Sequence, residues 1–216
     1  MEVGGPVPPI ADVIQAVPLN FLQGNAGIWT KEPGIIGSSW QLRAIDAGLQ
    51  HPARVSTPVT PFVDVTDSGI SIVWWTYWNT LATSSGSGIR YNFRIAGVDH
   101  IIQVYQWPAN LIALFDFGNI ITEASLPMNA WQFMALRYEN ATGDIRLDVN
   151  QALHYTANVG ALPLGPYANS VLQLEADVNG VGGLNMRFDE VAFFQELITD
   201  DQLDMLYNSG AGRTWP

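Results

Sequence analysis

The chain has 216 residues, of which 48% are hydrophobic and only 13% are charged, so it can bury a large core within one domain. Its formal net charge of −11, with nine Lys and Arg in total, argues against nucleic-acid and anionic-membrane partners, because cationic side chains make the contacts to phosphates. The absence of cysteine excludes disulfides and thiolate metal sites, while calcium or a neutral partner remains open. Plentiful Trp, Tyr, Phe, Gly and Pro favour strands and turns.

Residues 1–17 are rich in proline and glycine, which predicts an extended arm ahead of a folded domain at residues 18–216. The arm is either a disordered terminus or a segment that docks on a neighbouring subunit. It has no basic segment followed by a continuous apolar run, so we expect no secretory signal. The longest apolar run, near residues 69–78, is about half as long as a membrane span.

Short segments of high β propensity follow one another from residue 17 to residue 117. Strands are expected at residues 17–22, 39–43, 62–66, 70–78, 89–95, 100–106 and 111–117. Loops or turns are expected at residues 23–37, 51–61, 96–99 and 107–110. The last three of these strands are predicted to form an antiparallel meander.

The strand at residues 70–78 has aromatic side chains on both of its faces. Val73, Trp75 and Tyr77 alternate with Trp74 and Trp78, so the two sets point in opposite directions. One face must belong to the core. The other is either covered by a second layer or presented as an aromatic surface.

The second half of the chain has the clearest patterns. Apolar and polar residues alternate over residues 131–138 and 144–149. A polar link joins these segments and ends at Gly143, where a hairpin turn requires a positive φ, so the pattern predicts a hairpin. Further strands are expected at residues 151–157 and 171–176.

A strand at residues 186–194 is expected to run into a short amphipathic helix. Its alternation places Met186, Phe188, Glu190, Ala192 and Phe194 on one face and Arg187, Asp189, Val191 and Phe193 on the other. Thr199 and Gln202 have capping-box spacing at the start of the helix, and Gly210 is a plausible stop. Leu203, Leu206 and Tyr207 form its apolar face.

About a dozen short strands with frequent turns predict an all-β fold, a two-sheet antiparallel sandwich with one short C-terminal helix. Two segments, residues 131–150 and 188–208, resemble the laminin-G-like members of the concanavalin A-like lectin/glucanase superfamily, and residues 19–21 and 62–75 are more weakly similar. The resemblance implies a jelly-roll over nearly the whole chain after the arm. Its motifs mark the fold and leave the ligand open.

Many members of that superfamily hold a calcium ion between the first strand and an aspartate, and the resemblance places Asp189 at that position. The first-strand region reads Asn20-Phe-Leu-Gln-Gly24 where a second carboxylate is expected. Asp189 is therefore either a calcium ligand or a residue that orients the helix or caps a backbone amide.

Enzymatic signatures are weak. The superfamily's laminarinase-like branch carries an E-x-D-x-x-E strand, and Glu175 and Asp177 match its first two positions, but Gly180 stands at the third. The three histidines are about fifty residues apart, which is no metal-ligand spacing. Asn140-Ala-Thr matches a glycosylation sequon within the predicted turn. No catalytic residue is assigned.

Sugar-binding sites combine aromatic rings, which pack on the C–H faces of sugars, with polar groups that hydrogen-bond the hydroxyls. The candidates are Trp74, Trp78, Tyr105 and Trp107 as rings, with Asn79, Asn92 and Asp99 as polar partners. Core packing is the alternative for each tryptophan. Trp107, in a turn before Pro108, is the hardest to explain as core.

The leading hypothesis is a non-enzymatic, lectin-like binding or decoration module on the surface of a phage virion, in the capsid or tail, that binds glycans or another host surface. In it, the arm anchors the chain to other virion proteins within a homo-oligomer or larger assembly. One alternative is a glycan-cleaving hydrolase that uses Glu175 and Asp177. Another is a purely structural virion protein without a sugar ligand.

Overall fold

The computed structural model describes most of the chain from Asn20 to Gly212. The described residues are 20–21, 27–36, 38–44, 53–56, 64–65, 69–78, 87–95, 98–106, 110–115, 119–124, 127–161, 165–166, 168–176, 185–194 and 196–212. Side chains are described at residues 34–36, 69–78, 104, 127–153, 155–161, 187–194 and 196–212. The arm predicted at residues 1–17 lies outside the described residues.

Two seven-stranded antiparallel sheets form the body of the molecule. The first has the order β1 (Asn20–Phe21), β4 (Ala53–Ser56), β15 (Ala168–Ala176), β7 (Ser87–Ile95), β8 (Val98–Gln106), β9 (Asn110–Phe115), β10 (Asn119–Ala124). The second has the order β13 (Ala152–Asn158), β12 (Asp144–Val149), β11 (Trp131–Glu139), β6 (Gly69–Trp78), β16 (Asn185–Phe194), β3 (Ser38–Ala44), β2 (Gly27–Pro33). A small third sheet pairs β14 (Gly165–Pro166) with β5 (Asp64–Val65).

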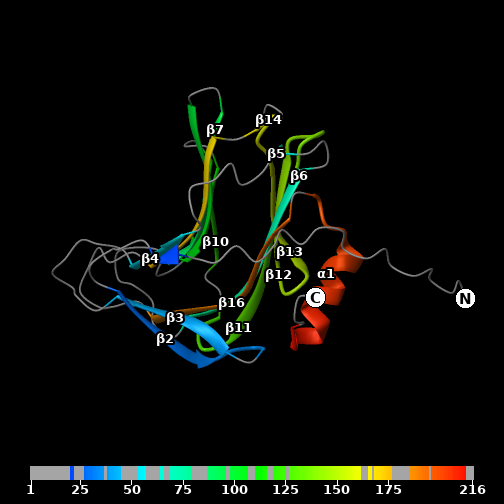
Figure 1. Cartoon of the computed structure of the whole chain (residues 1–216). Coiled ribbons are helices and arrows are strands. Elements are labelled where there is room, and N and C mark those ends of the chain that lie inside the picture. The colour runs from blue at the N-terminus through cyan, green and yellow to red at the C-terminus, as the bar shows by residue number, and fades with distance from the viewer. Residues whose placement is uncertain are drawn as a thin grey trace, which may run out of the picture.

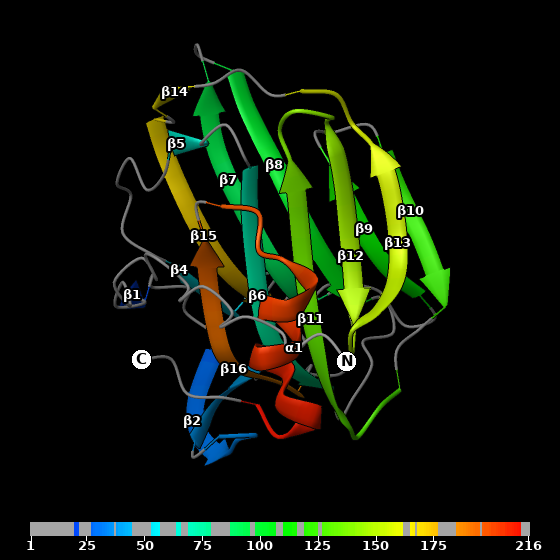
Figure 2. The same cartoon turned by 90° about the vertical axis from the view of Figure 1, so that its right-hand side faces the viewer.

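The two large sheets lie in separate layers, and the helix α1 (Asp200–Tyr207) lies outside them, against the second sheet (Figures 1 and 2). We call the side of the second sheet that carries α1 its outer face, and the side turned toward the first sheet its inner face. This arrangement confirms the predicted all-β sandwich with one short C-terminal helix.

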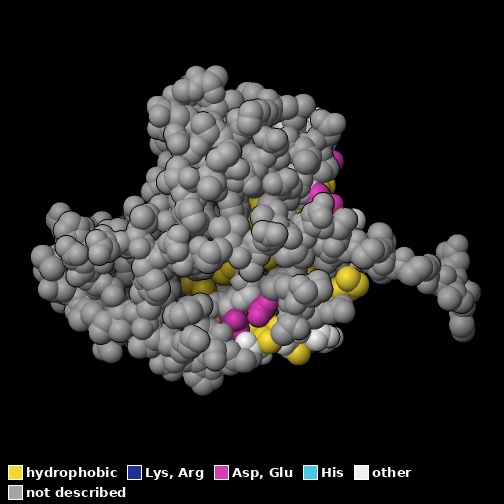
Figure 3. Space-filling view, viewed as in Figure 1, with side chains coloured by type: hydrophobic (Ala, Val, Ile, Leu, Met, Phe, Trp, Pro, Cys, Tyr) yellow, Lys and Arg dark blue, Asp and Glu magenta, His cyan; other side chains and the backbone are white. Residues whose placement is uncertain are grey.

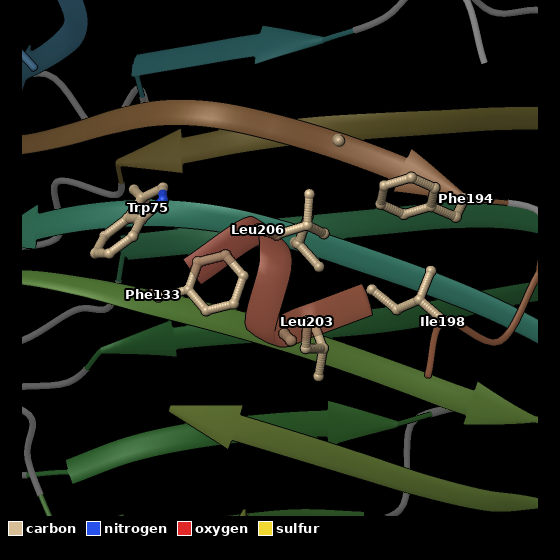
Figure 4. Close-up of a cluster of buried hydrophobic side chains, with 9 residues drawn as sticks. Trp75, Phe133, Phe194, Ile198, Leu203 and Leu206 are labelled. Atoms are coloured by element: carbon tan, nitrogen blue, oxygen red, sulfur yellow. The ribbon is translucent and has the colours of Figure 1, made fainter. Parts of the chain in front are cut away.

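The helix is held by a cluster of buried apolar side chains on the outer face. Leu203 and Leu206 of α1 are 3% and 5% exposed and lie over residues of β6, β11 and β16 (Figure 4). The rest of the cluster comprises Val73, Trp75, Phe133, Ala135, Ala192, Phe194 and Ile198. Burying one leucine contributes about 1.5–3 kcal/mol, so this face of α1 supplies much of the free energy that docks the helix.

The sequence signals at the start of the helix are confirmed. The Thr199 side chain accepts a hydrogen bond from the backbone amide of Gln202 at 3.2 Å, and the Thr199 amide donates to the Gln202 side chain at 2.7 Å. The helix ends earlier than predicted, because Asn208 rather than Gly210 takes the left-handed cap, with a φ of 47°. Asparagine tolerates that conformation better than most residues do.

The hairpin predicted around Gly143 is also confirmed. β11 and β12 pair from Met134 with Val149 to Glu139 with Asp144, and Gly143 has a φ of 74°. A Cβ atom at Gly143 would lie 2.4 Å from the backbone carbonyl carbon of Gly160, so both the φ and the space require glycine.

Five elements differ from the sequence prediction. Residues expected to form loops contain β2 and β4, neither β10 nor β14 was predicted, and Asp99 lies within β8 rather than in a turn. The meander prediction is correct, since β7, β8 and β9 are consecutive neighbours in the first sheet. The overlooked strands are defined by their pairing partners: β2 pairs with β3, β4 with β1 and β15, β10 with β9, and β14 with β5.

Candidate binding surface

Three side chains form a row across the outer face, beyond the C-terminal end of α1. Trp131 on β11 and Arg187 on β16 both stand opposite Tyr77 on β6, and directly opposed residues share a face of the sheet. The Trp131 and Tyr77 ring centroids are 5.5 Å apart, and the Arg187 guanidinium carbon lies 5.1 Å from the centre of the Tyr77 ring. All three side chains are half-buried. We call Trp131, Tyr77 and Arg187 the outer row.

The outer row continues into the core that holds the helix. The next row consists of Phe133, Trp75 and Asp189, all buried. Tyr207, at the end of α1, is stacked on Trp75 with a centroid distance of 5.7 Å and an interplanar angle of 13°. Aromatic side chains therefore run from the buried helix contact to the half-exposed row, which gives the row a rigid base.

A β-bulge shapes the strand beside the outer row. Asp189 stands opposite Trp75, but the next β6 residue on that face, Val73, stands opposite Ala192, so β16 has one extra residue here. Glu190 at the bulge has a φ of 47°, in the left-handed region. The predicted alternation of β16 is therefore wrong beyond the bulge, because Ala192 and Phe194 lie on the same face as Arg187 and Asp189.

Asp189 ties the bulge to the segment between β2 and β3. Its Oδ2 accepts a hydrogen bond from the Ile36 amide at 3.1 Å, and its Oδ1 accepts one from the Glu190 amide at 3.0 Å. Of the interpretations left open by the sequence, capping of backbone amides is the one these contacts confirm. Asp189 thus fixes the shape of β16 next to Arg187.

Two adjacent carboxyl groups at the bulge have perturbed acidity. Burial raises the pKa of Asp189, and hydrogen bonds from the amides of Ile36, Glu190 and Ile35 partly oppose this effect. Burial, reinforced by the charge of Asp189, raises the pKa of Glu190 from 4.5 to about 7. Because its pKa is about 7, Glu190 changes charge near neutral pH. On the face of the molecule seen in Figure 3, acidic side chains lie beside hydrophobic ones.

The calcium ion implied by the resemblance needs a second ligand from the region Asn20–Gly24, whose side chains lie outside the described residues. Both oxygens of Asp189 accept backbone amides, and the described residues contain no group of three or more His, Asp or Glu side chains that could hold a metal. Calcium prefers six to eight oxygen ligands. The calcium site at Asp189 therefore stays a prediction.

A second group of charges anchors the other end of the helix. Arg137 of β11 donates to Asp148 at 2.9 Å, to the Ile198 carbonyl at 3.0 Å and to Asp200 at 2.7 Å. Arg146 donates to the other oxygen of Asp148 at 2.8 Å. The pKa of Asp200 is lowered, chiefly by its hydrogen bond from Arg137. The network joins β11 and β12 to Ile198 and Asp200, so it holds the start of α1 on the sheet.

The sequence-predicted sugar-binding residues are not gathered at one described site. Trp74 and Trp78 are 1% and 2% exposed on the inner face, so their rings pack between the sheets and offer no face to a ligand at the surface. Tyr105, Asn92 and Asp99 lie on β8 or β7, and their side chains are outside the described residues, as are Asn79 and Trp107 altogether. For these five the prediction remains a prediction.

The outer row was missed, although alternation separated Tyr77 from Trp74 and Trp78. A sequence pattern does not say which face of a doubly apolar strand is covered by the other sheet. The signal that could have found the row is the pairing of β6 with β11, which places the tryptophan at the start of β11 beside Tyr77.

The sequon residue Asn140 is buried, whereas the acidic residues Glu175 and Asp177 have no described side chains. Asn140 of the sequon is 8% exposed, and its Oδ1 is 3.1 Å from the Tyr138 hydroxyl, so the folded turn hides the acceptor. Glu175 lies on β15 with no described side chain, and Asp177 lies outside the described residues. No described helix is long and apolar enough to cross a membrane.

No protein-family model matches the sequence, and no curated protein is significantly similar to it. Among solved structures, the binding domain of Paraclostridial mosquitocidal protein 1 is 15% identical with a TM-score of 0.62, covering 89% of this chain and 48% of that chain. A botulinum neurotoxin type C structure, of a toxin that depends upon interaction with two ganglioside molecules to enter cells, is 14% identical with a TM-score of 0.61, covering 85% and 45%.

An endo-β-1,4-glucuronan lyase from the fungus Trichoderma reesei is 11% identical with a TM-score of 0.63, covering 82% of this chain and 90% of that chain. The present chain thus spans about half the length of the toxin structures and most of the lyase. These likenesses establish a fold that is shared with toxin binding domains and a polysaccharide lyase.

Proposed function

We propose that this chain is a non-enzymatic, lectin-like binding module that recognises glycans. The observation that carries the proposal is the outer row, where Trp131 and Tyr77 are half-exposed next to the Arg187 guanidinium. Aromatic rings pack on the C–H faces of sugars, and phenol groups hydrogen-bond their hydroxyls. The row supplies both kinds of contact on one rigid face.

The shared fold supports the same proposal. Its neighbours include one toxin that interacts with gangliosides and one lyase that acts on glucuronan. We further propose that the chain is related to the laminin-G-like, concanavalin A-like jelly-rolls, since the strand and capped helix implied by that resemblance are present as β16 and α1. The buried carboxylates Asp148 and Asp189 are engaged by structural donors, which favours binding over catalysis.

A glycan array with the full chain tests the proposal. We expect binding to at least one glycan class, and we expect Trp131→Ala to weaken it about tenfold, because an aromatic contact contributes on the order of 0.5–1.5 kcal/mol beyond the area that it buries. Met128→Ala is the matched control, since Met128 is also exposed and only three positions before Trp131 but is not in the row. The absence of any bound glycan, or equal losses in both variants, would contradict the proposal.

A glycan-cleaving enzyme is the second candidate, and the likeness to a glucuronan lyase is the observation that favours it. Glu175 on β15 is its proposed acidic residue. Incubation with polysaccharides, followed by detection of new chain ends, tests this candidate. Activity that disappears in Glu175→Gln would replace the non-enzymatic proposal.

The setting on a phage virion stays a prediction from the sequence, as does the role of the arm at residues 1–17 in assembly. A purely structural role would be supported by an array that shows no binding. Deleting residues 1–17 tests the anchoring role, since a folded sandwich that assembles normally without them would exclude it.

A further inference from the structure

We propose that Asn129 is the hydroxyl-binding residue beside the outer row: a neutral sugar unit packs its C–H face on Trp131 while two adjacent hydroxyls bond the side-chain amide of Asn129. This inference rests on the proposed glycan-binding function, to which it adds a specificity-determining residue and a ligand class. The sequence suggested no role for Asn129, which lies in the turn ahead of β11.

The turn at residues 127–130 holds Asn129 against the outer row. The backbone amide of Asn129 donates to the carbonyl of Trp78, the last residue of β6, at 2.7 Å. Asn129 is therefore fixed beside the residue that follows Tyr77 on β6, and it precedes Trp131 by two residues. Two residues of chain span at most about 7 Å, so one sugar unit can contact the side chains of both Asn129 and Trp131.

The side chain of Asn129 differs from those of the other asparagines with the same backbone conformation. Among the described residues, Asn129, Asn150 and Asn208 have a positive φ, at 58°, 49° and 47°. The Asn150 side chain accepts the Phe133 amide at 2.9 Å, and that of Asn208 donates to the Gly212 carbonyl at 2.8 Å. The Asn129 side chain is exposed and has no hydrogen bond to a described residue. Its carbonyl and amino groups are therefore available to a sugar.

The ring partner of Asn129 is held from both sides of its strand. On one side, the backbone amide of Asn150 donates to the Phe133 carbonyl at 2.8 Å, while the Asn150 side chain accepts the Phe133 amide. On the other side, the Trp131 ring centroid lies 5.5 Å from that of Tyr77. Because the strand and the ring are already fixed, little conformational freedom remains to be lost when a sugar binds.

The chemistry around the row favours a neutral sugar. An asparagine amide has an acceptor oxygen and two N–H donors in one plane, so it can bond two adjacent hydroxyls, each of which both donates and accepts. Asp189 and Glu190 follow Arg187 along β16, and Arg187 already interacts within the chain. The net charge of −11 repels anions in general. A sugar that carries a carboxylate is therefore disfavoured.

A glycan array that carries neutral oligosaccharides and their uronic-acid counterparts tests the ligand class with the full chain. We expect the neutral members to bind better. Isothermal titration with the best-bound neutral oligosaccharide then tests the residue. Asn129→Gly should weaken binding about tenfold, since it removes one or two neutral hydrogen bonds. Glycine adopts a φ of 58° without strain, so the melting temperature should stay unchanged.

Met128→Ala is the matched control, because it truncates an exposed side chain of the same turn and keeps Asn129. It should leave binding unchanged. Binding that survives Asn129→Gly but is lost in Trp131→Ala would overturn the inference and leave glycan binding intact. Uronic-acid glycans that bind as well as the neutral ones would also overturn it, as would equal losses in Asn129→Gly and Met128→Ala. If the array is blank, both proposals fail.

Discussion

Replacing Arg137 by Met should destabilise the protein far more than the same change at Arg146, although both arginines bond Asp148 at nearly the same distance. The bonds are 2.9 and 2.8 Å long. The arginines differ in burial, since the Arg137 side chain is 7% exposed and that of Arg146 is 38% exposed, while Asp148 is 2% exposed. Burial, rather than bond length, should therefore set the cost.

The magnitudes follow from the surroundings of each pair. Arg137→Met takes the buried partner from Asp148 and leaves it only the partly exposed Arg146, so the cost should approach the roughly 3–5 kcal/mol of a broken buried ion pair. Arg137→Met also removes the donor to the Ile198 carbonyl and to Asp200, which frees the start of α1 from the sheet. For Arg146→Met we expect about 1 kcal/mol or less, as for partly exposed ion pairs, since Asp148 keeps Arg137.

Urea unfolding followed by tryptophan fluorescence measures both changes. With a slope of about 3 kcal/mol per molar urea, Arg137→Met should lower the unfolding midpoint by roughly 1–2 M and Arg146→Met by roughly 0.3 M or less. The double variant Arg137→Met/Asp148→Leu should recover a large part of the loss, because an apolar pair can replace a buried ion pair. Equal midpoint shifts for the two arginine variants would refute the reasoning that burial decides the cost.

Three further predictions concern the helix contact and the bulge. Leu206→Ala should lower the free energy of unfolding by about 2–5 kcal/mol, because it opens a cavity beneath α1; a calorimetric change below 1 kcal/mol would show that the contact collapses without cost. Glu190 binds its proton more tightly in the folded state, so stability should fall as the pH rises from about 4.5 through about 7, and thermal melts across this range should be flatter for Glu190→Gln. If calcium binds at Asp189, millimolar calcium should raise the melting temperature and Asp189→Asn should abolish the rise, whereas an unchanged melting temperature would exclude the predicted site.

Local patterns in the sequence predicted the elements whose signals are short-ranged. The hairpin of β11 and β12 follows from alternation and from Gly143, and the start of α1 follows from Thr199 and Gln202. Each of these features depends on residues within a few positions of one another. The sequence therefore predicted them together with the all-β class.

The candidate site needed the tertiary structure. Alternation in β6 separated Tyr77 from Trp74 and Trp78, but both faces of the strand are apolar, so no local pattern identified the inner face. The other sheet covers Trp74 and Trp78, and α1 covers the opposite face only as far as Trp75. Tyr77 therefore remains half-exposed, next to Trp131 from another strand.

The bulge in β16 is the other feature that the sequence did not predict. Period-two alternation fixes faces only while a strand is regular, and one left-handed residue, Glu190, moves Ala192 to the face of Asp189. Asp189 accepts the Ile36 amide across 153 positions of sequence, so this geometry depends on a distant contact. The sequence by itself determined the all-β class, the β11–β12 hairpin and the helix start, because their causes are local. The tertiary structure decided which side chains reach the surface, because that depends on which layer covers each face.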